Sequence, residues 1–120
     1  MPWIAAGQFP PRIRIGPTYV PGQGACFECQ ERATRRDYPL YDELAELRRA
    51  RPTVAATLGA ASAIVGGAIA MEAVHLLTGI CRPATLSCAV IVDLRDLSVK
   101  REPFERDPAC PRCAEVSLAD

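Results

Sequence analysis

The chain has 120 residues with 14 basic and 14 acidic side chains, so its formal net charge is zero. A balanced charge creates no overall field that favours nucleic acid, an acidic membrane surface or another polyanion, and 6% aromatic residues do not suggest a base-stacking platform. A chain of this length is expected to fold as one domain, residues 1–120, whose core needs no disulfide bonds.

Two short strands are predicted at the amino-terminal end. The apolar run from Pro2 to Ala6 is typical of a buried strand, which we expect Gly7 to end. Residues 12–15 alternate arginine and isoleucine, the period of a half-buried strand. Because proline cannot donate a hydrogen bond to a neighbouring strand, Pro17 indicates a sheet edge or a β-bulge.

A charged crossover segment, residues 30–52, follows. Half of residues 28–51 are charged, six of each sign, so we expect this part of the chain to be solvated. Leu40, Leu44 and Leu47 share one helical face, which predicts a short amphipathic helix from Leu40 to Ala50 that Pro52 stops. The arginines of this segment could bind phosphate, but the interleaved acids favour a salt-bridged exposed surface.

A long helix is predicted from Thr53 to Thr78. Residues 54–71 carry no charge, and the stretch is long enough to span a membrane, but it is rich in Ala and Gly and poor in large apolar side chains. We therefore expect a buried helix of a soluble protein, with Thr53 as N-cap and Gly79 just past its end. Its small residues favour packing against a sheet or a partner subunit.

His75, the single histidine, lies in the last turn of this helix, where its interaction with the helix dipole and with Glu72 favours a structural role. A β-hairpin is predicted next, with one strand over residues 86–94 and a second beginning near Leu97. On this pattern Cys88 is a small core residue, and Cys81 lies in the connection before the hairpin, partly exposed.

Two Cys-x-x-Cys pairs, at residues 26–29 and 110–113, enclose most of the foldable sequence. Four thiolates on two tight turns suit the closed tetrahedral site of a structural Zn²⁺, which predicts a metal site that joins the two ends of the chain. Disulfides and redox Cys-x-x-Cys motifs are the alternatives. No apolar signal segment precedes the first pair, which favours a reducing, cytoplasmic location over disulfides.

Six motifs occur in a characteristic order. They are P-x-I-A-A, P-G-x-G-A-C-F-E-C, a charged crossover, A-M-E-A-V-H-L-L-T-G, a hairpin with I-V-D-L, and R-D-P-A-C-P-R-C. In order and spacing, over Pro2 to Ala114, the chain resembles the carboxyl-terminal half of the ThiF/MoeB/HesA adenylyltransferases, relatives of the ubiquitin-activating enzymes. The fold class that this implies is α/β, with a small mixed sheet and one long buried helix. A zinc ion would join the two ends of the chain, which would form the carboxyl-terminal half of a Rossmann-like, ubiquitin-activating-type fold.

The resemblance also implies roles for particular residues. The structural zinc of the family would be held by the four cysteines of the two pairs: Cys26, Cys29, Cys110 and Cys113. The family's reaction is attack of a carboxyl-terminal carboxylate, on a ubiquitin-like sulfur carrier or a peptide, at the α-phosphate of ATP. ATP and Mg²⁺ bind the amino-terminal Rossmann half of such enzymes, whose motifs this sequence lacks. The Gly22-x-Gly24 loop is not expected to replace them, because it precedes a cysteine pair rather than opening a helix after a strand.

Two departures from the family pattern affect the expected chemistry. Residues 50–53 contain no cysteine where thioester-forming members carry one, and His75 stands where the family's long-helix motif has lysine. We therefore assign neither catalytic nor cofactor-binding residues to this chain. By itself it is expected to be inactive, and its enzymatic status depends on the rest of an adenylating enzyme.

Two hypotheses on function follow. In the first, the chain is the zinc-binding part of an adenylating enzyme, completed by a Rossmann half or a homodimer partner, that receives a carrier protein or peptide. In the second, it is a non-catalytic zinc-stabilised module that binds a protein or leader peptide. Neither hypothesis involves nucleic acid or a membrane.

Overall fold

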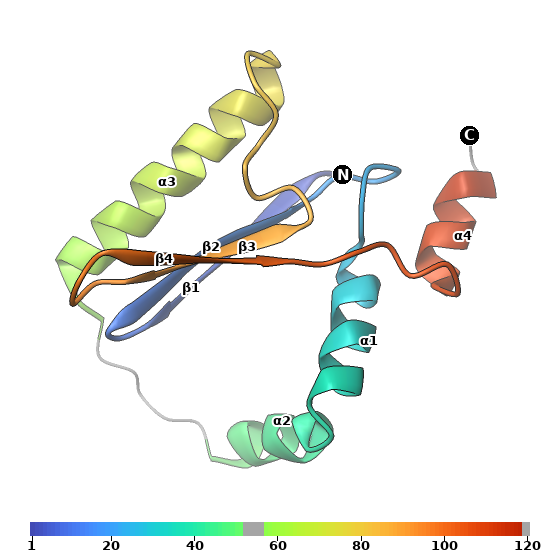
Figure 1. Cartoon of the computed structure of the whole chain (residues 1–120), viewed down its shortest axis with the longest axis horizontal. Coiled ribbons are helices and arrows are strands. Elements are labelled where there is room, and N and C mark those ends of the chain that lie inside the picture. Colours follow the sequence, from blue (N-terminus) through green and yellow to red (C-terminus); the bar gives the residue numbers. More distant parts are fainter. Residues whose placement is uncertain (52–56, 119–120) are drawn as a thin grey trace.

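The computed structural model describes residues 1–51 and 57–118 of the chain. It has an α/β fold, as predicted, in which a sheet carries one long helix while shorter helices extend from its other end (Figure 1). In chain order the elements are β1 (Trp3–Phe9), β2 (Arg12–Tyr19), α1 (Phe27–Asp37), α2 (Tyr41–Ala50), α3 (Gly59–Thr78), β3 (Cys88–Asp93), β4 (Ser98–Pro103) and α4 (Pro111–Leu118).

The four strands form one sheet in the order β1-β2-β3-β4, and every neighbouring pair is antiparallel. The prediction of a mixed sheet is therefore wrong. Within the described residues, parallel pairing is limited to a single isolated bridge, between Thr18 and Leu86. For two of the pairs the reason is the short links: two residues join β1 to β2 and four join β3 to β4, and such connections allow antiparallel pairing alone.

The pairing of β1 with β2 contains the β-bulge that Pro17 predicted. Ile4 pairs with Thr18 and Ala6 with Ile15, so one residue of β1 faces two residues of β2, Gly16 and Pro17. The expectation that Gly7 ends the first strand is wrong, because Gly7 pairs with Arg14 and the strand continues to Phe9. Backbone hydrogen bonds to the partner strand sustain β1 through a residue that has no side chain to pack.

One side of α3 packs on the sheet. Ala61 and Val65 of the helix enclose Ile13 of β2, with Ile15 and Ile69 around them. Gly79 follows the helix in the left-handed conformation, with φ of 68°, as predicted. The proposed N-cap Thr53 lies outside the described residues, but the helix begins later than expected, at Gly59, because Leu58 is extended.

The other side of α3 is exposed. Of its 20 residues, the buried ones are Ala61, Val65 and Glu72, whereas Met71 and Leu77 are 54% and 85% exposed. The predicted burial therefore holds for the sheet side of the helix alone. With a mean hydropathy of 1.6 in its most apolar window, α3 is long and apolar enough to cross a membrane. In the structure it lies instead against β1 and β2.

Glu72, on the buried side of α3, ties the helix to the loop before β3. Its carboxylate accepts hydrogen bonds from the amides of Ala84 and Thr85, at 3.2 and 2.8 Å, and from the Thr85 hydroxyl at 2.6 Å. The Thr85 hydroxyl also lies 2.7 Å from that of Thr18 in β2. Burial alone would raise the pKa of Glu72, but these hydrogen bonds outweigh it and hold the pKa below its usual 4.5.

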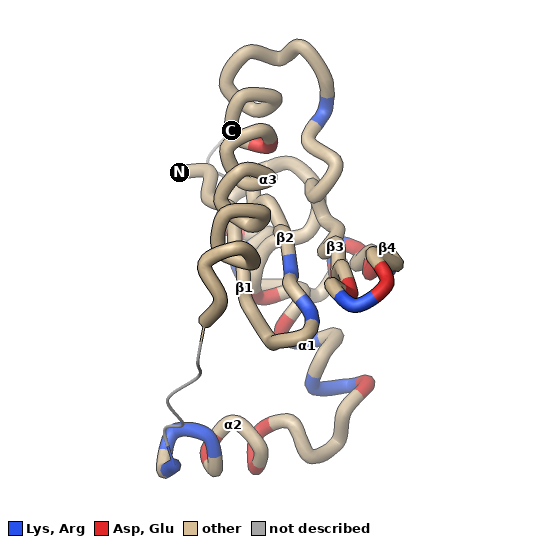
Figure 2. Tube along the Cα trace, turned by 90° about the vertical axis from the view of Figure 1, so that its left-hand side faces the viewer, with Lys and Arg blue, Asp and Glu red and all other residues tan. Residues whose placement is uncertain are grey.

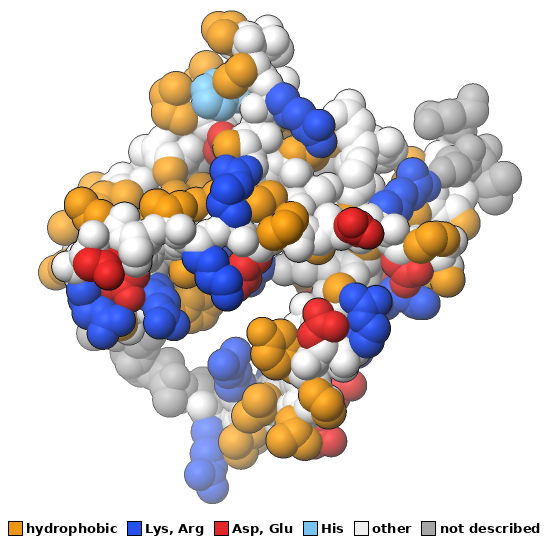
Figure 3. Space-filling view, in the orientation of Figure 1, with side chains coloured by type: hydrophobic (Ala, Val, Ile, Leu, Met, Phe, Trp, Pro, Cys, Tyr) orange, Lys and Arg blue, Asp and Glu red, His pale blue; other side chains and the backbone are white. Residues whose placement is uncertain are grey.

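The crossover segment forms two helices, α1 and α2. The predicted amphipathic helix is confirmed as α2, Tyr41–Ala50, although Leu40, Leu44 and Leu47 remain more than half exposed. Figure 3 shows hydrophobic side chains gathered over α2, apart from the sheet. Helix α1 was not predicted, because its sequence is dominated by charges rather than by an apolar stripe; Figure 2 shows these charges along both helices.

The predicted hairpin is present as β3 and β4, although β3 begins at Cys88 rather than at residue 86. Cys88 is buried and Cys81 is exposed, in agreement with their expected places. Beyond β4 the chain returns to α1, and the first turn of α4 lies near the first turn of α1 (Figure 1).

Candidate metal centre

Four cysteines converge between the first turns of α1 and α4. Cys26 is the N-cap of α1 and Cys29 lies in its first turn, while Cys110 and Cys113 occupy the equivalent places in α4. In each pair the three-residue spacing at a helix start turns both side chains to the same side. The structure thus brings together the four residues that the sequence predicted as metal ligands.

The distances between the sulfur atoms fit a tetrahedral metal site. Sγ of Cys26 lies 3.7 Å from that of Cys29 and 3.6 Å from that of Cys110, and the sulfurs of Cys29 and Cys113 are 3.5 Å apart. All four sulfurs lie within 4.8 Å of one another. Four thiolates at about 2.3 Å from a central Zn²⁺ would be about 3.8 Å apart, so the cluster can hold a metal ion with little movement.

The cysteines of this cluster are free thiols. Their sulfurs are much farther apart than the roughly 2.05 Å of a disulfide bond. The structure therefore favours the metal interpretation over the alternatives of disulfides or a redox pair. Three of the four cysteines are buried, and Cys26 alone is partly open.

The surroundings of the cluster affect its thiols unequally. Burial raises the pKa of the Cys26 thiol to about 12. At Cys29 burial also opposes ionisation, but hydrogen bonds, beginning with that from the Asp107 amide at 3.4 Å, lower the pKa to about 7. In the absence of a cation these thiols cannot all ionise together, because each thiolate would repel the next. A divalent ion would supply the missing positive charge.

Polar contacts hold the segment before α4 against α1. Arg32 of α1 donates to the carboxylate of Asp107 at 2.6 Å, and the same carboxylate accepts from the amide of Ala109 at 2.8 Å. Both contacts lower the pKa of Asp107, with the Ala109 amide contributing most. Arg106 donates to the carbonyl of Cys113 at 3.0 Å. These contacts orient the second cysteine pair toward the first.

The glycine loop before α1 positions the first cysteine pair of the cluster. Gly24 has φ of 67°, and a Cβ atom there would lie 2.1 Å from the Ser87 hydroxyl, which accepts a hydrogen bond from the Ala25 amide at 2.9 Å. Contrary to expectation, the loop does join a strand to a helix. The Cys29 amide at this helix start hydrogen-bonds to the Cys26 thiol, so the positive end of α1 faces the metal site rather than a phosphate.

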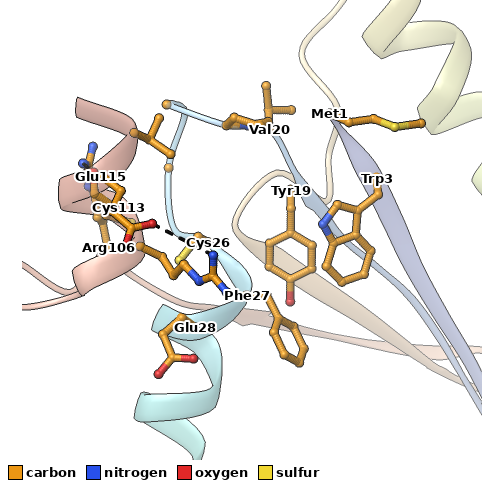
Figure 4. A pocket seen from close by; sticks show the side chains of 15 residues that line it. Met1, Trp3, Tyr19, Val20, Cys26, Phe27, Glu28, Arg106, Cys113 and Glu115 are labelled. Carbon is orange, nitrogen blue, oxygen red and sulfur yellow. Dashed lines mark hydrogen bonds and ion pairs between the residues drawn. The ribbon is translucent and has the colours of Figure 1, made fainter. Parts of the chain in front are cut away.

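Sequence reasoning missed an aromatic pocket beside the cluster. Its volume is about 590 Å³, and its walls include Trp3, Phe27 and both Cys26 and Cys113 (Figure 4). The ring centroids of Trp3 and Tyr19 are 4.4 Å apart, and the Tyr19 hydroxyl donates to Gln30. The sequence predicted Trp3 to lie in a buried strand, but Trp3 is 46% exposed. The rings come from β1, β2 and α1, so no local pattern could reveal their meeting.

The remaining predicted residues lie away from the cluster. His75 is 3.4 Å from the Glu72 carboxylate, in the structural role expected of it. In the crossover segment, Arg35 forms an ion pair with Asp42, and Arg36 forms one with Asp37. These pairs support the prediction of a salt-bridged exposed surface over that of a phosphate site. In the described part of the chain, the four thiols are the one group of His, Cys, Asp and Glu side chains placed to hold a metal. The absence of catalytic and nucleotide-binding residues remains a prediction.

The fold, an antiparallel sheet with one long helix and a four-cysteine cluster, is shared with part of known enzyme structures. No family model matches the chain, and no curated protein matches it. Among solved structures, it is similar to Escherichia coli MccB crystallised with ATP, with a TM-score of 0.71 and 24% identity, over 93% of this chain and 31% of MccB.

Further structures share the fold. The microcin C7 biosynthetic enzyme MccB in complex with N-formylated MccA has a TM-score of 0.72 and 23% identity, over 93% of this chain and 33% of that one. A heterocyclase in complex with substrate and cofactor has a TM-score of 0.67 and 19% identity, over 93% of this chain and 17% of that one. The chain thus spans about a third of the MccB structures. The TM-scores establish a shared fold, and at identities below 25% the likeness shows the fold alone.

Proposed function

We propose that this chain is the zinc-binding carboxyl-terminal portion of an enzyme that uses ATP to adenylate the carboxyl terminus of a peptide. The observation that carries the proposal is the agreement in fold with MccB over 93% of the chain, together with four clustered thiols. MccB has been crystallised both with ATP and with MccA. This favours a peptide over a ubiquitin-like carrier protein as the partner.

Zinc is the metal proposed for the cluster. Four thiolates at tetrahedral spacing form a closed coordination shell, which suits a structural ion and leaves no position for water or substrate. The ion would join α1 to α4, and with them the crossover helices to the sheet. It would supply stability, whereas the chemistry of adenylation would take place elsewhere in the enzyme.

The nucleotide is assigned to another part of the enzyme because the described residues do not fit it. Within residues 1–51 and 57–118, the glycine loop that follows a strand and opens a helix is the one before α1, and its helix start faces the cysteines. A triphosphate needs backbone amides and cations directed at its oxygens. We therefore propose that no catalytic step takes place on this chain.

The surface left open on this chain supports a missing partner. Helix α3 exposes Ile64, Met71 and Leu77 on the side away from the sheet, and β1 is an edge strand. We propose that the Rossmann half of the enzyme, or a second copy of the chain, packs on this apolar side. That contact would remove side chains from water that an isolated domain rarely exposes together.

Complementation in trans tests this function. MccB lacking the third that matches this chain would be mixed with the zinc-loaded chain, MccA and ATP, and exchange of labelled pyrophosphate into ATP would be followed. The matching third of MccB, produced separately, is the positive control. We expect exchange with the mixture and none with the chain alone. Exchange by the chain alone would contradict the assignment of the nucleotide to another half.

A second candidate is a zinc-stabilised module that binds a peptide without catalysis. The observation that favours it is the aromatic pocket of about 590 Å³ beside the cysteine cluster, which residues of this chain line. It is distinguished by the same experiment. If the MccB third restores exchange and this chain does not, yet the chain binds peptide, the non-catalytic module is the better description.

A further inference from the structure

The face of the sheet opposite α3 carries most of its charged side chains. Because side chains alternate along a strand, Ile13 points toward α3 whereas Arg12 and Arg14 point to the other face. Across the sheet, Asp93 pairs in register with Arg12 and Ile91 with Arg14. This open face borders two cavities, of about 600 and 690 Å³.

Arg14 differs from the other cations of this face in having no partner. Arg12 lies 3.7 Å from Asp93, which Arg95 also contacts at 2.7 Å, and Lys100 lies 3.1 Å from Glu102. Arg14 makes neither an ion pair nor a hydrogen bond within the described residues, and its Nε atom is buried. A buried donor without an acceptor is costly, and Arg14 as a whole is only partly buried, so an external acceptor can approach the guanidinium.

Both cavities meet at Arg14, and each is partly apolar. Phe9, which is more than half exposed, and Ile91 line the first cavity with Arg14. Tyr38, also mostly exposed, and Phe104 line the second with Arg14. An extended segment crossing this face could therefore place an apolar side chain in each cavity and a negative group between them.

We propose that Arg14 binds the side-chain carboxylate of an Asp or Glu in the peptide substrate, at a position flanked by apolar residues. A guanidinium presents two parallel N–H groups that match the two oxygens of a carboxylate. One unpaired cation suits a single carboxylate rather than a polyanion. The peptide's terminal carboxylate is consumed at ATP, so a carboxylate at Arg14 belongs to a side chain. This assignment of the substrate rests on the function proposed above.

Nuclear magnetic resonance of the zinc-loaded chain tests the assignment without ATP. The probes are acetyl-Leu-Asp-Leu-amide and its Asn counterpart, and the signal is the Arg14 Nε–Hε resonance, identified by its absence in Arg14→Gln. We expect the Asp peptide to shift this resonance and to bind roughly tenfold more tightly than the Asn peptide. Arg14→Gln should abolish that preference, Arg14→Lys should retain part of it, and Arg12→Gln, on the same face, should leave it unchanged.

Three outcomes would overturn the proposal. Equal binding of the Asp and Asn peptides would show that no carboxylate is recognised. Tight binding of acetyl-Leu-Asn-Leu with a free carboxyl terminus would assign Arg14 to the terminal carboxylate instead. A shift of the Arg14 resonance in Glu105→Gln without peptide would show that Glu105, which lines the same cavity, already neutralises it. Since ATP takes no part, failure here leaves the pyrophosphate-exchange test of function standing.

Discussion

Replacing Glu72 by glutamine should destabilise the fold strongly although it changes one atom. In the native protein one carboxylate oxygen accepts from the Ala84 amide and the other from the amide and hydroxyl of Thr85. A glutamine has a single acceptor oxygen. Whichever way its amide group is turned, an NH₂ group faces a backbone N–H, and one buried amide of the loop loses its acceptor.

The expected magnitude follows from these contacts. A buried donor left without an acceptor costs about 1–3 kcal/mol, and the remaining hydrogen bonds lose the strengthening of a charged acceptor. We expect Glu72→Gln to lower the free energy of unfolding by about 2–4 kcal/mol, a large part of the roughly 5–15 kcal/mol of a typical domain. Glu46→Gln on exposed α2 is the control and should change it by less than about 0.5 kcal/mol.

Urea unfolding of the zinc-loaded protein measures this effect, and its pH dependence provides a second check. Because the pKa of Glu72 is lowered in the folded protein, its contribution is complete above its usual value of 4.5 and is lost as the pH falls through the folded value. The difference between wild type and Glu72→Gln should therefore shrink below about pH 4.5. Equal stability of the two proteins at pH 7 would refute the role assigned to the carboxylate.

Three further predictions concern the metal and the chemistry. Metal analysis after exhaustive dialysis should find about one zinc per chain, and Cys29→Ser should reduce this content and the stability, because structural zinc contributes roughly 10–16 kcal/mol in small peptides; two intact disulfides would contradict the site. Replacing Cys81 and Cys88 by serine should leave adenylation by the complemented enzyme intact, and a covalent adduct lost in Cys81→Ser would show otherwise. Calorimetry should detect no micromolar binding of ATP to the isolated chain, and sedimentation would show whether it dimerises.

Local patterns in the sequence predicted those features that depend on near neighbours. Two Cys-x-x-Cys pairs identified the four cysteines that cluster, since three-residue spacing on a helix start presents both thiols together. The apolar run before Gly79 predicted most of α3, and Pro17 marked the bulge in β2. In each case the decisive information lies within a few residues along the chain.

Features made by residues distant in sequence were not predicted. Nothing near Glu72 indicates that it caps the loop at Thr85, and nothing near Trp3 indicates that its ring meets Tyr19. The charged sequence of α1 has no apolar stripe that would predict a helix. In the structure Cys29 in its first turn contacts Cys113, and Arg35 forms an ion pair with Glu31 one turn earlier.

The sequence by itself determined the four candidate metal ligands, the long helix, the hairpin and the resemblance to an adenylyltransferase half, because residue type and local spacing decide each of these. Tertiary structure alone decided the antiparallel order of the sheet, the burial of one side of α3, and the isolation of Arg14 among paired charges. The alternation along β2 shows which way Arg14 points, but whether a carboxylate meets it depends on strands that the chain reaches some 75 residues later.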